Sequence, residues 1–344
     1  MLRVKREGVI LRPTELEFEN LSVFNPGILQ EGNTVHVVYR AISKDYISTL
    51  GYAKLDGPTK VVERWTKPFM KPRYGYEKKG IEDPRITKIN GTIYMTYVVH
   101  DGRNAMTAYS SGPDLFHLKR EGIISPQITY NKAGKLFNSS KLKDDYYTFK
   151  SYYKEYVGDN VKVWDKDGFF FPEKIKNQYV FMHRILPDVQ IAPAKHIYFL
   201  KTREYWERNI KRLSKFIVLE PNFGWETRHV GGGCPPIKTR HGWLLIYHGV
   251  EHFNSGRVYH AGAALLDLKN PKHVIARLPE PFMSPEKRYE ERGHVDNVVF
   301  PTGTSIFGDR LYIYYGATDS EIAVASVNLD RMIEELLKNK IEKH

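Results

Sequence analysis

The sequence predicts an all-β fold, a five-bladed β-propeller with helical additions. The main observation is a phrase that recurs five times: a polar turn with Gly or Asn, four or five alternating apolar residues, then Tyr or His beside a polar residue. The copies begin about 60 to 85 residues apart, which suits a four-stranded sheet with its loops. The aromatic content of 13%, with 23 Tyr, also suits a sheet protein with ring-lined clefts. The copies are EGNTVHVVYRA from Glu31, INGTIYMTYVVHDG from Ile89, IKNQYVFMHRI from Ile175, TRHGWLLIYHGV from Thr239 and IFGDRLYIYYGATD from Ile306.

Strand signals dominate along the whole chain. Residues alternate between apolar and polar from Thr92 to Val98 and from Leu311 to Tyr315, and Asn-Gly, His-Gly or Gly-Asp turns bound such runs. In a propeller the inner strand of every blade ends near one axis, so residues far apart in sequence converge there. We therefore expect the chemistry at the polar end of each phrase.

Two stretches predict helices added to the sheets. The segment Thr202 to Phe216 spaces Tyr205, Ile210 and Leu213 at helical intervals. The chain closes with DRMIEELLKNKIEKH, which places Met332, Ile333, Leu336 and Leu337 on one stripe. Packing on the domain, or on a second subunit of a homo-oligomer, explains both stripes without a cofactor.

Length and repetition predict a single catalytic domain over residues 1–344. Similar segments are spread from Glu31 to Asp319, which leaves no room for a second core. The start MLRVKREGVI is charged where a secretory signal needs an apolar run, and no stretch reaches the ~20 apolar residues of a membrane span. We expect a cytoplasmic protein. The single cysteine, Cys234, excludes an intrachain disulfide and a multi-cysteine metal site, and is expected to be buried.

The net charge of +12 raises the question of a nucleic-acid partner. The lysines are scattered, however, and no nucleic-acid-binding module is recognisable. A small anionic substrate explains a basic chain equally well, because a positive cleft raises the local concentration of anions. We favour that explanation.

The segment EDPR, which precedes the second phrase, supplies a candidate general acid. Pro84 restricts Asp83 to an extended or turn geometry. A carboxylate held there, next to Glu82 and within reach of Arg85, can have its pKa moved in either direction.

Two further segments carry cationic candidates. Lys166 and Arg184 are 18 residues apart and flank the start of the third phrase. His229 precedes the glycine run from Gly231 to Gly233, which allows close approach of backbone to a ligand, and His248 follows in the fourth phrase. These four side chains could form a cradle for phosphate or sulfate. A zinc site at His229, His248 and His252 is weakly indicated, because no carboxylate pattern accompanies the histidines.

Taken together, these motifs resemble glycoside hydrolase family 130. The resemblance covers nearly the whole chain, in order, and the family is a five-bladed β-propeller that acts on β-mannosides with inversion. Most members are phosphorylases that release α-mannose 1-phosphate, and some are hydrolases. The motifs are FNPG at Phe24, YRA at Tyr39, EDPR at Glu82, FPEKI at Phe171, GGGCPPIKTRHGWLLIYHGV at Gly231, VDNVVFPTG at Val295 and YYGATD at Tyr314.

The resemblance implies a role for each matching residue. Asp83 would be the general acid that protonates the glycosidic oxygen, directly or through a hydroxyl of the mannose. Asn25, Arg40 and Asp319 would hold the mannose, with Glu82 beside the acid. No metal or organic cofactor is implied, and inorganic phosphate would be the co-substrate.

The same resemblance leaves two enzyme activities open. Lys166, Arg184, His229 and His248 stand where phosphorylases of the family carry Arg, Arg, Lys and His, so two of the four positions differ. A phosphorylase needs no general base, whereas an inverting hydrolase needs a second carboxylate ~6.5–9.5 Å from the acid. Glu226, Glu290 and Glu291 are the candidates for that base.

The sequence favours an inverting phosphorylase for short β-1,2-linked manno-oligosaccharides. Glu82 stands where mannan phosphorylases of the family have Tyr, which resembles the branch acting on β-1,2 linkages. The alternatives are a β-1,2-mannosidase and a non-catalytic glycan-binding propeller, since a fold alone does not fix a function.

Overall fold

Antiparallel strands make up most of the protein, and the computed structural model describes residues 2–341. Strands account for 47% of the chain and helices for 18%, so the prediction of a mostly β protein is confirmed. The strands fall into five consecutive sets of antiparallel neighbours.

The sets follow one another along the chain. The first contains β2 (Ser22–Glu31), β3 (Thr34–Ile42), β4 (Ser48–Asp56) and β5 (Lys60–Arg64). The second contains β6 (Gly80–Ile89), β7 (Thr92–His100), β8 (Ala105–Gly112) and β9 (Lys119–Ile123), and one parallel bridge between Ser48 and Gly80 joins it to the first. The third contains β10 (Lys166–Phe170), β11 (Tyr179–Ile185), β12 (Asp188–Ala194) and β13 (Ile217–Leu219). The fourth contains β14 (His229–Gly232), β15 (Ile237–Thr239), β16 (Gly242–Phe253), β17 (Gly256–Leu266) and β18 (Val274–Arg277).

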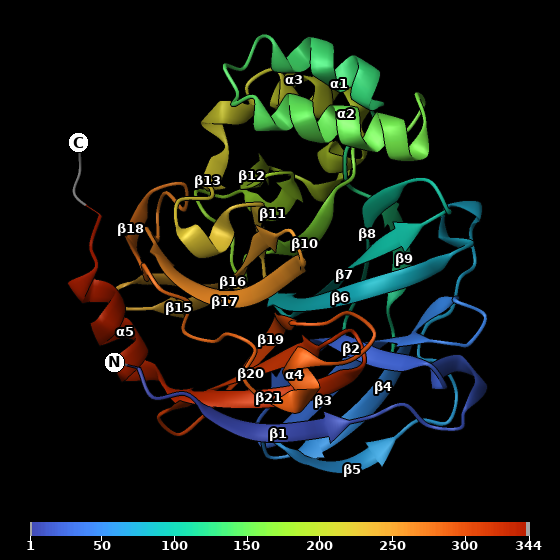
Figure 1. The fold of residues 1–344 in the computed structure, drawn as a ribbon, viewed down its shortest axis with the longest axis vertical. Coiled ribbons are helices and arrows are strands. Elements are labelled where there is room, and N and C mark those ends of the chain that lie inside the picture. Colours follow the sequence, from blue (N-terminus) through green and yellow to red (C-terminus); the bar gives the residue numbers. More distant parts are fainter. Residues whose placement is uncertain (1, 342–344) are drawn as a thin grey trace.

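The fifth set joins the two ends of the chain. It contains β19 (Val299–Phe307), β20 (Arg310–Ala317) and β21 (Glu321–Asn328), and β1 (Lys5–Leu11) pairs with the outer edge of β21. Figure 1 shows the blue β1 lying along the red strands of this sheet. The first strand of the chain therefore belongs to the same sheet as the last three strands.

The first strands of the sets lie next to one another. β2 contacts both β6 and β19, and β10 contacts β6 and β14. The five repeated phrases form the second strands, β3, β7, β11, β16 and β20, rather than these innermost ones. Each phrase begins at or just before the tight turn from the first strand and carries its apolar residues into the middle of a sheet.

The hydrophobic core lies between successive sheets. One apolar cluster joins Val37 and Leu55 of the first set to Tyr314 and Val324 of the fifth. Another joins the third set to the fourth, and it includes Met182. Face-to-face packing of alternating strands explains this arrangement, because each strand turns apolar side chains to both of its covered faces. Cys234 is buried in the cluster between the fourth and fifth sets, as predicted.

Three helices cap one end of the molecule, above the third set (Figure 1). They are α1 (Tyr130–Phe137), α2 (Asp145–Val157) and α3 (Arg203–Ile210). The predicted helix over Thr202 to Phe216 is α3 followed by a 3₁₀ turn at Leu213–Lys215, and its buried residues face α1 within the same chain. Sequence reasoning missed α1 and α2; the tyrosine-rich segment of α2, DYYTFKSYYKEYV, also suits a strand.

The remaining helices lie near the fifth set. The short α4 (Arg288–Glu291) precedes β19, and α5 (Leu329–Lys338) follows β21. The predicted stripe of α5 is confirmed, since Met332, Ile333 and Leu336 are buried against β17, β18 and β21. Residues 342–344 of the predicted terminal helix lie outside the described residues. Over residues 2–341, none of the helices is long and apolar enough to cross a bilayer.

Candidate active site

A repeated backbone irregularity aims three polar side chains into one cavity. Asn25, Asp83 and Asp167 have positive φ of 48°, 51° and 56° and are followed by Pro, Pro and Gly. Asn and Asp tolerate this left-handed conformation better than most residues, although it still costs about 1–3 kcal/mol that the surrounding fold must offset. The strand pairing of β2, β6 and β10 shifts register at these points, between Phe24 and Gly27, Glu82 and Arg85, and Lys166 and Phe169.

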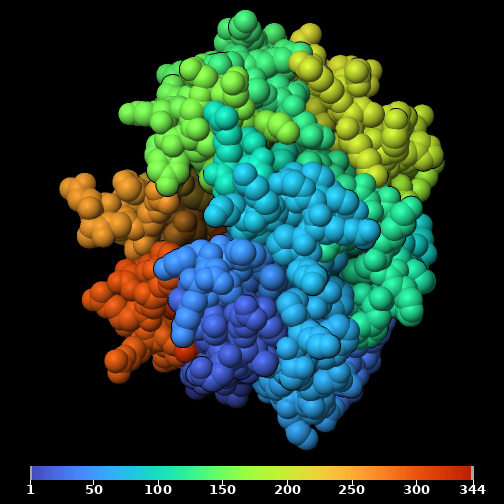
Figure 2. Space-filling view, turned by 90° about the vertical axis from the view of Figure 1, so that its right-hand side faces the viewer, coloured from blue at the N-terminus to red at the C-terminus, as the bar shows by residue number. Residues whose placement is uncertain are grey.

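These side chains line a polar cavity of about 830 Å³. The cavity reaches from the first strands of the sets to the hairpin between β16 and β17, and Figure 2 shows the surface hollowed where this orange segment approaches the green helical segment. Six of the predicted site residues lie on its wall: Asn25, Arg40, Asp83, Lys166, Arg184 and Asp319.

Asp83 is positioned by two neighbours from the first set. Its Oδ1 accepts a hydrogen bond of 2.8 Å from Nδ2 of Asn25 and lies 3.5 Å from Nη1 of Arg40. The side chain is 8% exposed. Since both contacts are to Oδ1, Oδ2 is the oxygen left to exchange a proton with a molecule in the cavity.

Glu82 bridges two cations behind Asp83. Its Oε1 lies 3.0 Å from Nη2 of Arg40, and its Oε2 lies 3.2 Å from Nζ of Lys166. Burial alone would raise the pKa of Glu82, but these two cations outweigh it and lower the pKa to about 2. Glu82 is therefore ionised at neutral pH and fixes Arg40 and Lys166 in place, which is a positioning role.

Asp319 has the opposite environment. Burial raises its pKa to about 6, and the charge of Asp83 adds to the effect although Arg40 opposes it. A group that titrates this close to neutrality can bind a sugar hydroxyl either as acceptor or as donor. Asp83 and Asp319 on the cavity wall, and Glu82 behind Asp83, thus have different environments.

Lys166 and Arg184 are directly opposite each other on β10 and β11. Burial tends to lower the pKa of Lys166, but Glu82 and then Asp83 raise it, so the ammonium is retained. Nε of Arg184 lies 3.0 Å from Oδ2 of Asp167. Both cations line the cavity, on neighbouring strands of the third set.

The two predicted histidines lie beside this pair but supply no positive charge. His229 lines a smaller pocket next to the cavity, whereas His248 is fully buried between Phe300 and Gly231, with Nε2 3.8 Å from Oδ2 of Asp167. Burial, and then the charge of Arg184, holds the pKa of both imidazoles well below the usual value. Of the four side chains considered as a phosphate site, the two histidines are therefore neutral.

The glutamates considered as alternative bases lie elsewhere. Glu226 and Glu290 are fully buried, and each accepts hydrogen bonds from a Tyr of the second strand and an Arg of an outer strand. Glu291 is exposed and does not line the cavity. The pattern recurs as Glu19–Tyr39–Arg64, Glu226–Tyr247–Arg277 and Glu290–Tyr315–Arg6, with Glu77 and Arg120 forming a related ion pair. These carboxylates anchor the sheets, so their geometry does not support a role as base.

Sequence reasoning missed other residues of the cavity wall, among them Asp167, Arg257 and Tyr259. Asp167 occupies in the third set the position of Asn25 and Asp83, and the signal for it was the recurrence of Asn-Pro, Asp-Pro and Asp-Gly at the same point of three sets. Tyr259 and Arg257 come from β17, which only the folded hairpin brings to the cavity.

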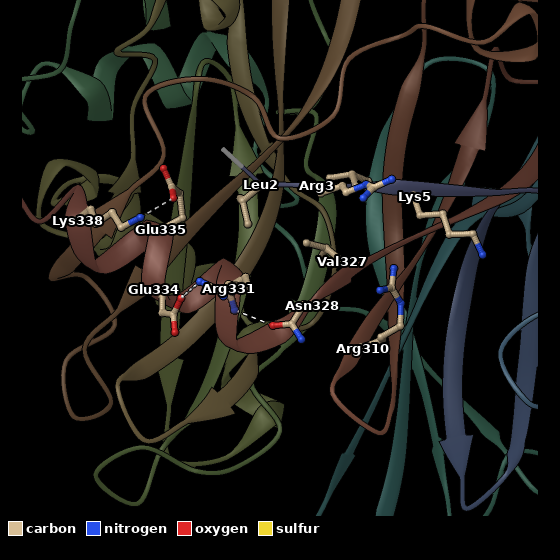
Figure 3. Close-up of a pocket in the computed structure, with 11 residues that line it drawn as sticks. Leu2, Arg3, Lys5, Arg310, Val327, Asn328, Arg331, Glu334, Glu335 and Lys338 are labelled. Atoms are coloured by element: carbon tan, nitrogen blue, oxygen red, sulfur yellow. Dashed lines mark hydrogen bonds and ion pairs between the residues drawn. The ribbon is translucent and has the colours of Figure 1, made fainter.

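One further groove of the surface contains none of the predicted site residues. A groove of about 750 Å³ lies between the start of the chain and α5, and Figure 3 shows its side chains paired with one another, as Arg331 with Glu334 and Lys338 with Glu335. Over the described part of the chain, no group of three or more His, Cys, Asp or Glu is placed to hold a metal ion.

A family model and two related proteins match this chain over nearly its whole length. A family model described as beta-1,4-mannooligosaccharide phosphorylase matches residues 4–338. A 1,2-beta-oligomannan phosphorylase of Thermoanaerobacter sp. (strain X514) is 34% identical over 343 residues, covering 96% of this chain and 98% of the relative. A beta-1,2-mannobiose phosphorylase of the same strain is 32% identical, with the same coverage of both chains.

A solved structure shares the fold. The beta-1,2-mannobiose phosphorylase of Listeria innocua, determined with beta-1,2-mannobiose, superposes with a TM-score of 0.72 at 23% identity, covering 97% of this chain and 99% of that one.

Proposed function

Because the chain belongs to glycoside hydrolase family 130, we propose that it is an inverting phosphorylase of β-mannosides. It takes inorganic phosphate as co-substrate and releases α-mannose 1-phosphate. Its preferred substrates are short β-1,2-linked manno-oligosaccharides. The family model is described by a β-1,4 activity, but the two relatives aligned over 98% of their own length are both named for β-1,2 linkages, which supports that choice.

The observation that carries the proposal is the pair of cations next to the acid. Lys166 and Arg184 stand opposite each other on neighbouring strands, in the same cavity as Asp83. An anionic nucleophile needs neutralisation and orientation rather than a base, and a low-dielectric cavity strengthens both effects. Of the glutamates considered as base for a hydrolase, Glu226 and Glu290 are held in ion pairs, and none of the three lines the cavity.

The proposed reaction is a single displacement. A phosphate oxygen attacks the anomeric carbon of the mannose while the bond from that carbon to the glycosidic oxygen breaks. Asp83 delivers its proton to the departing oxygen, directly or through a hydroxyl of the mannose, and later regains a proton from solvent. Asn25, Arg40 and Asp319 hold the mannose, and Glu82 holds the two cations. No step uses a metal or an organic cofactor.

We also propose that the five sets are the blades of one propeller spanning residues 1–344. The contacts of β2 with β6 and β19, the contacts of β10 with β6 and β14, and the pairing of β1 with β21 support a closed ring of sheets. In such a ring Asn25, Asp83 and Asp167 would face one axis, which accounts for their meeting in one cavity.

The test is an incubation of the purified protein with β-1,2-mannobiose or β-1,4-mannobiose, each with and without inorganic phosphate. We expect mannose 1-phosphate only when phosphate is present, and faster from the β-1,2 sugar. Mannose released at equal rates without phosphate would instead identify a mannosidase.

A further inference from the structure

A second, smaller pocket adjoins the cavity. Its volume is about 220 Å³, and four of its lining residues, Lys166, Arg184, Arg257 and Tyr259, also line the larger cavity. Groups that line both spaces mark the place where the two spaces meet. A small molecule in this pocket would therefore lie against the two cations that face the proposed reacting centre.

Positive charge in the small pocket exceeds the negative charge that could balance it. Lys166 and Arg184 each have a carboxylate partner, Glu82 and Asp167. Arg228 and Arg257 also line the pocket, and neither forms an ion pair with a carboxylate of residues 2–341. Burial, and then repulsion from Arg257, lowers the pKa of Arg228, as expected for cations gathered without an anion.

Arg228 also determines how His229 can act. Its Nη1 lies 2.7 Å from Nδ1 of His229. Arginine can only donate, so Nδ1 of the neutral imidazole must accept, and the ring proton is on Nε2. His229 therefore presents an N–H donor to the pocket that it lines.

Aromatic side chains of α2 lie around these groups. The guanidinium of Arg228 lies 5.2 Å from the ring centre of Phe149 on α2, a cation–π contact. Tyr152, Tyr153 and Tyr156 of the same helix line the pocket. Tyr153 is buried and Tyr152 and Tyr156 are exposed, so α2 forms one wall of a pocket that opens to solvent.

We propose that Arg228 and Arg257 bind inorganic phosphate in this small pocket, with Nε2–H of His229 as a further donor. Phosphate carries a charge of about −1.5 at neutral pH and offers several acceptor oxygens, which match a guanidinium fork. The bound anion contacts Lys166 and Arg184, which also line the larger cavity where the mannose is proposed to bind. The proposal rests on the phosphorylase function above. It gives the bound phosphate two positively charged partners, which the two neutral histidines do not provide.

The test varies phosphate and β-1,2-mannobiose separately in initial-rate measurements on Arg228→Met, Arg257→Met and Arg228→Lys. We expect Arg228→Met to raise the KM for phosphate about 10- to 100-fold while the KM for mannobiose changes less than about twofold. Arg257→Met should raise it less, because Arg257 is more exposed, and Arg228→Lys should recover part of the loss. The matched control is Arg208→Met, an exposed arginine of α3, which should leave both constants unchanged.

The outcomes separate this proposal from the proposed function. If the wild-type protein forms no mannose 1-phosphate from either mannobiose, the phosphorylase function fails. If the wild type forms it but Arg228→Met and Arg257→Met keep the wild-type KM for phosphate, the small pocket is not the phosphate site. For each variant whose melting temperature lies within a few degrees of wild type, calorimetric titration with phosphate measures binding directly. Arg257→Met changes a residue on the exposed hairpin, so it tests the pocket even if Arg228→Met fails to fold.

Discussion

Asp83 and Asp319 line the same cavity but are prepared for different tasks by their neighbours. Asp83 has one oxygen bound by Asn25 and Arg40 and one left to exchange a proton. Asp319 is partly buried, and this burial is the main cause that raises its pKa to about 6. Neighbouring acids with different environments are the usual means by which a site assigns acid and binding roles.

Substituting Asp83 by Asn tests its role as general acid. We expect Asp83→Asn to lower the rate of mannobiose phosphorolysis by about 10²–10⁴-fold. A substrate with a good leaving group, such as 4-nitrophenyl β-mannoside, needs no proton and should lose much less activity. Equal losses on both substrates, measured at saturating phosphate, would show that Asp83 serves binding rather than proton transfer.

The pKa of Asp319 predicts a stability that depends on pH. The folded state holds the Asp319 proton up to about pH 6, whereas an unfolded Asp releases it near its ordinary value of about 3.9. Between these values the folded state binds more protons than the unfolded state, so the unfolding free energy falls as the pH rises. Above pH 6 the full loss of unfolding free energy is present.

We therefore expect Asp319→Asn to gain stability over wild type at pH 7–8. The difference in unfolding free energy between the two proteins should be about 1–3 kcal/mol more favourable to the variant there than at pH 4, while mannoside binding is impaired. Urea unfolding at both pH values measures this, with the exposed Asp45→Asn as control. A difference between wild type and Asp319→Asn that is the same at pH 4 and pH 8 would mean that Asp319 does not carry the shifted pKa.

At the scale of elements, two devices recur from set to set. A positive-φ Asn or Asp in the first strand places a polar side chain at the cavity, and a buried Glu ties a Tyr of the second strand to an Arg of an outer strand. In the fifth set that Arg is Arg6, which comes from β1 at the other end of the chain. The same ion pair that anchors a sheet elsewhere thus holds the first strand to the last set.

Removing Arg6 should weaken this closure. Arg6→Met leaves the buried carboxylate of Glu290 without its cation, and we expect a loss of about 3–5 kcal/mol in the free energy of unfolding. Arg12→Met removes an exposed arginine that pairs with Glu321 at 3.1 Å, and should cost at most about 1 kcal/mol. Urea midpoints of the two variants measure the contrast, and similar losses would refute a special role for the Arg6 pair.

Sequence patterns predicted the elements unevenly, for physical reasons. Tight turns and period-two alternation located β7 and β20 to within about two residues, because both signals are local. The tyrosine-rich α2 was missed, since packing against α1 rather than intrinsic propensity decides its helical state. The role of Glu226 could not be foreseen either, because Arg277 lies 51 residues further along the chain and meets it only in the folded sheet.

At the scale of the whole molecule, the candidate site depends on all five sets. Asn25 and Arg40 come from the first set, Asp83 from the second, Lys166 from the third and Tyr259 from the fourth. Asp319 lies in the turn between β20 and β21 of the fifth. Motif matching to a known family found most of these residues, since each sits in a short recognisable segment. It could not find Arg228 and Arg257 as partners for an anion, because only the folded chain places both in one pocket beside two neutral histidines.

The net charge of +12 acquires a specific interpretation at this scale. The cavity and its neighbouring pocket concentrate Lys166, Arg184, Arg228 and Arg257, and only the first two have carboxylate partners among the described residues. A field of this sign favours a small anion entering the site.

The central claim is that phosphate displaces the leaving sugar from the face opposite to Asp83. Proton NMR of the first product formed from β-1,2-mannobiose in phosphate buffer tests it most directly, because the anomeric signal reports the configuration before it can equilibrate. The account predicts α-mannose 1-phosphate, formed only with phosphate. A β-configured phosphate, or free mannose formed equally fast in its absence, would contradict it.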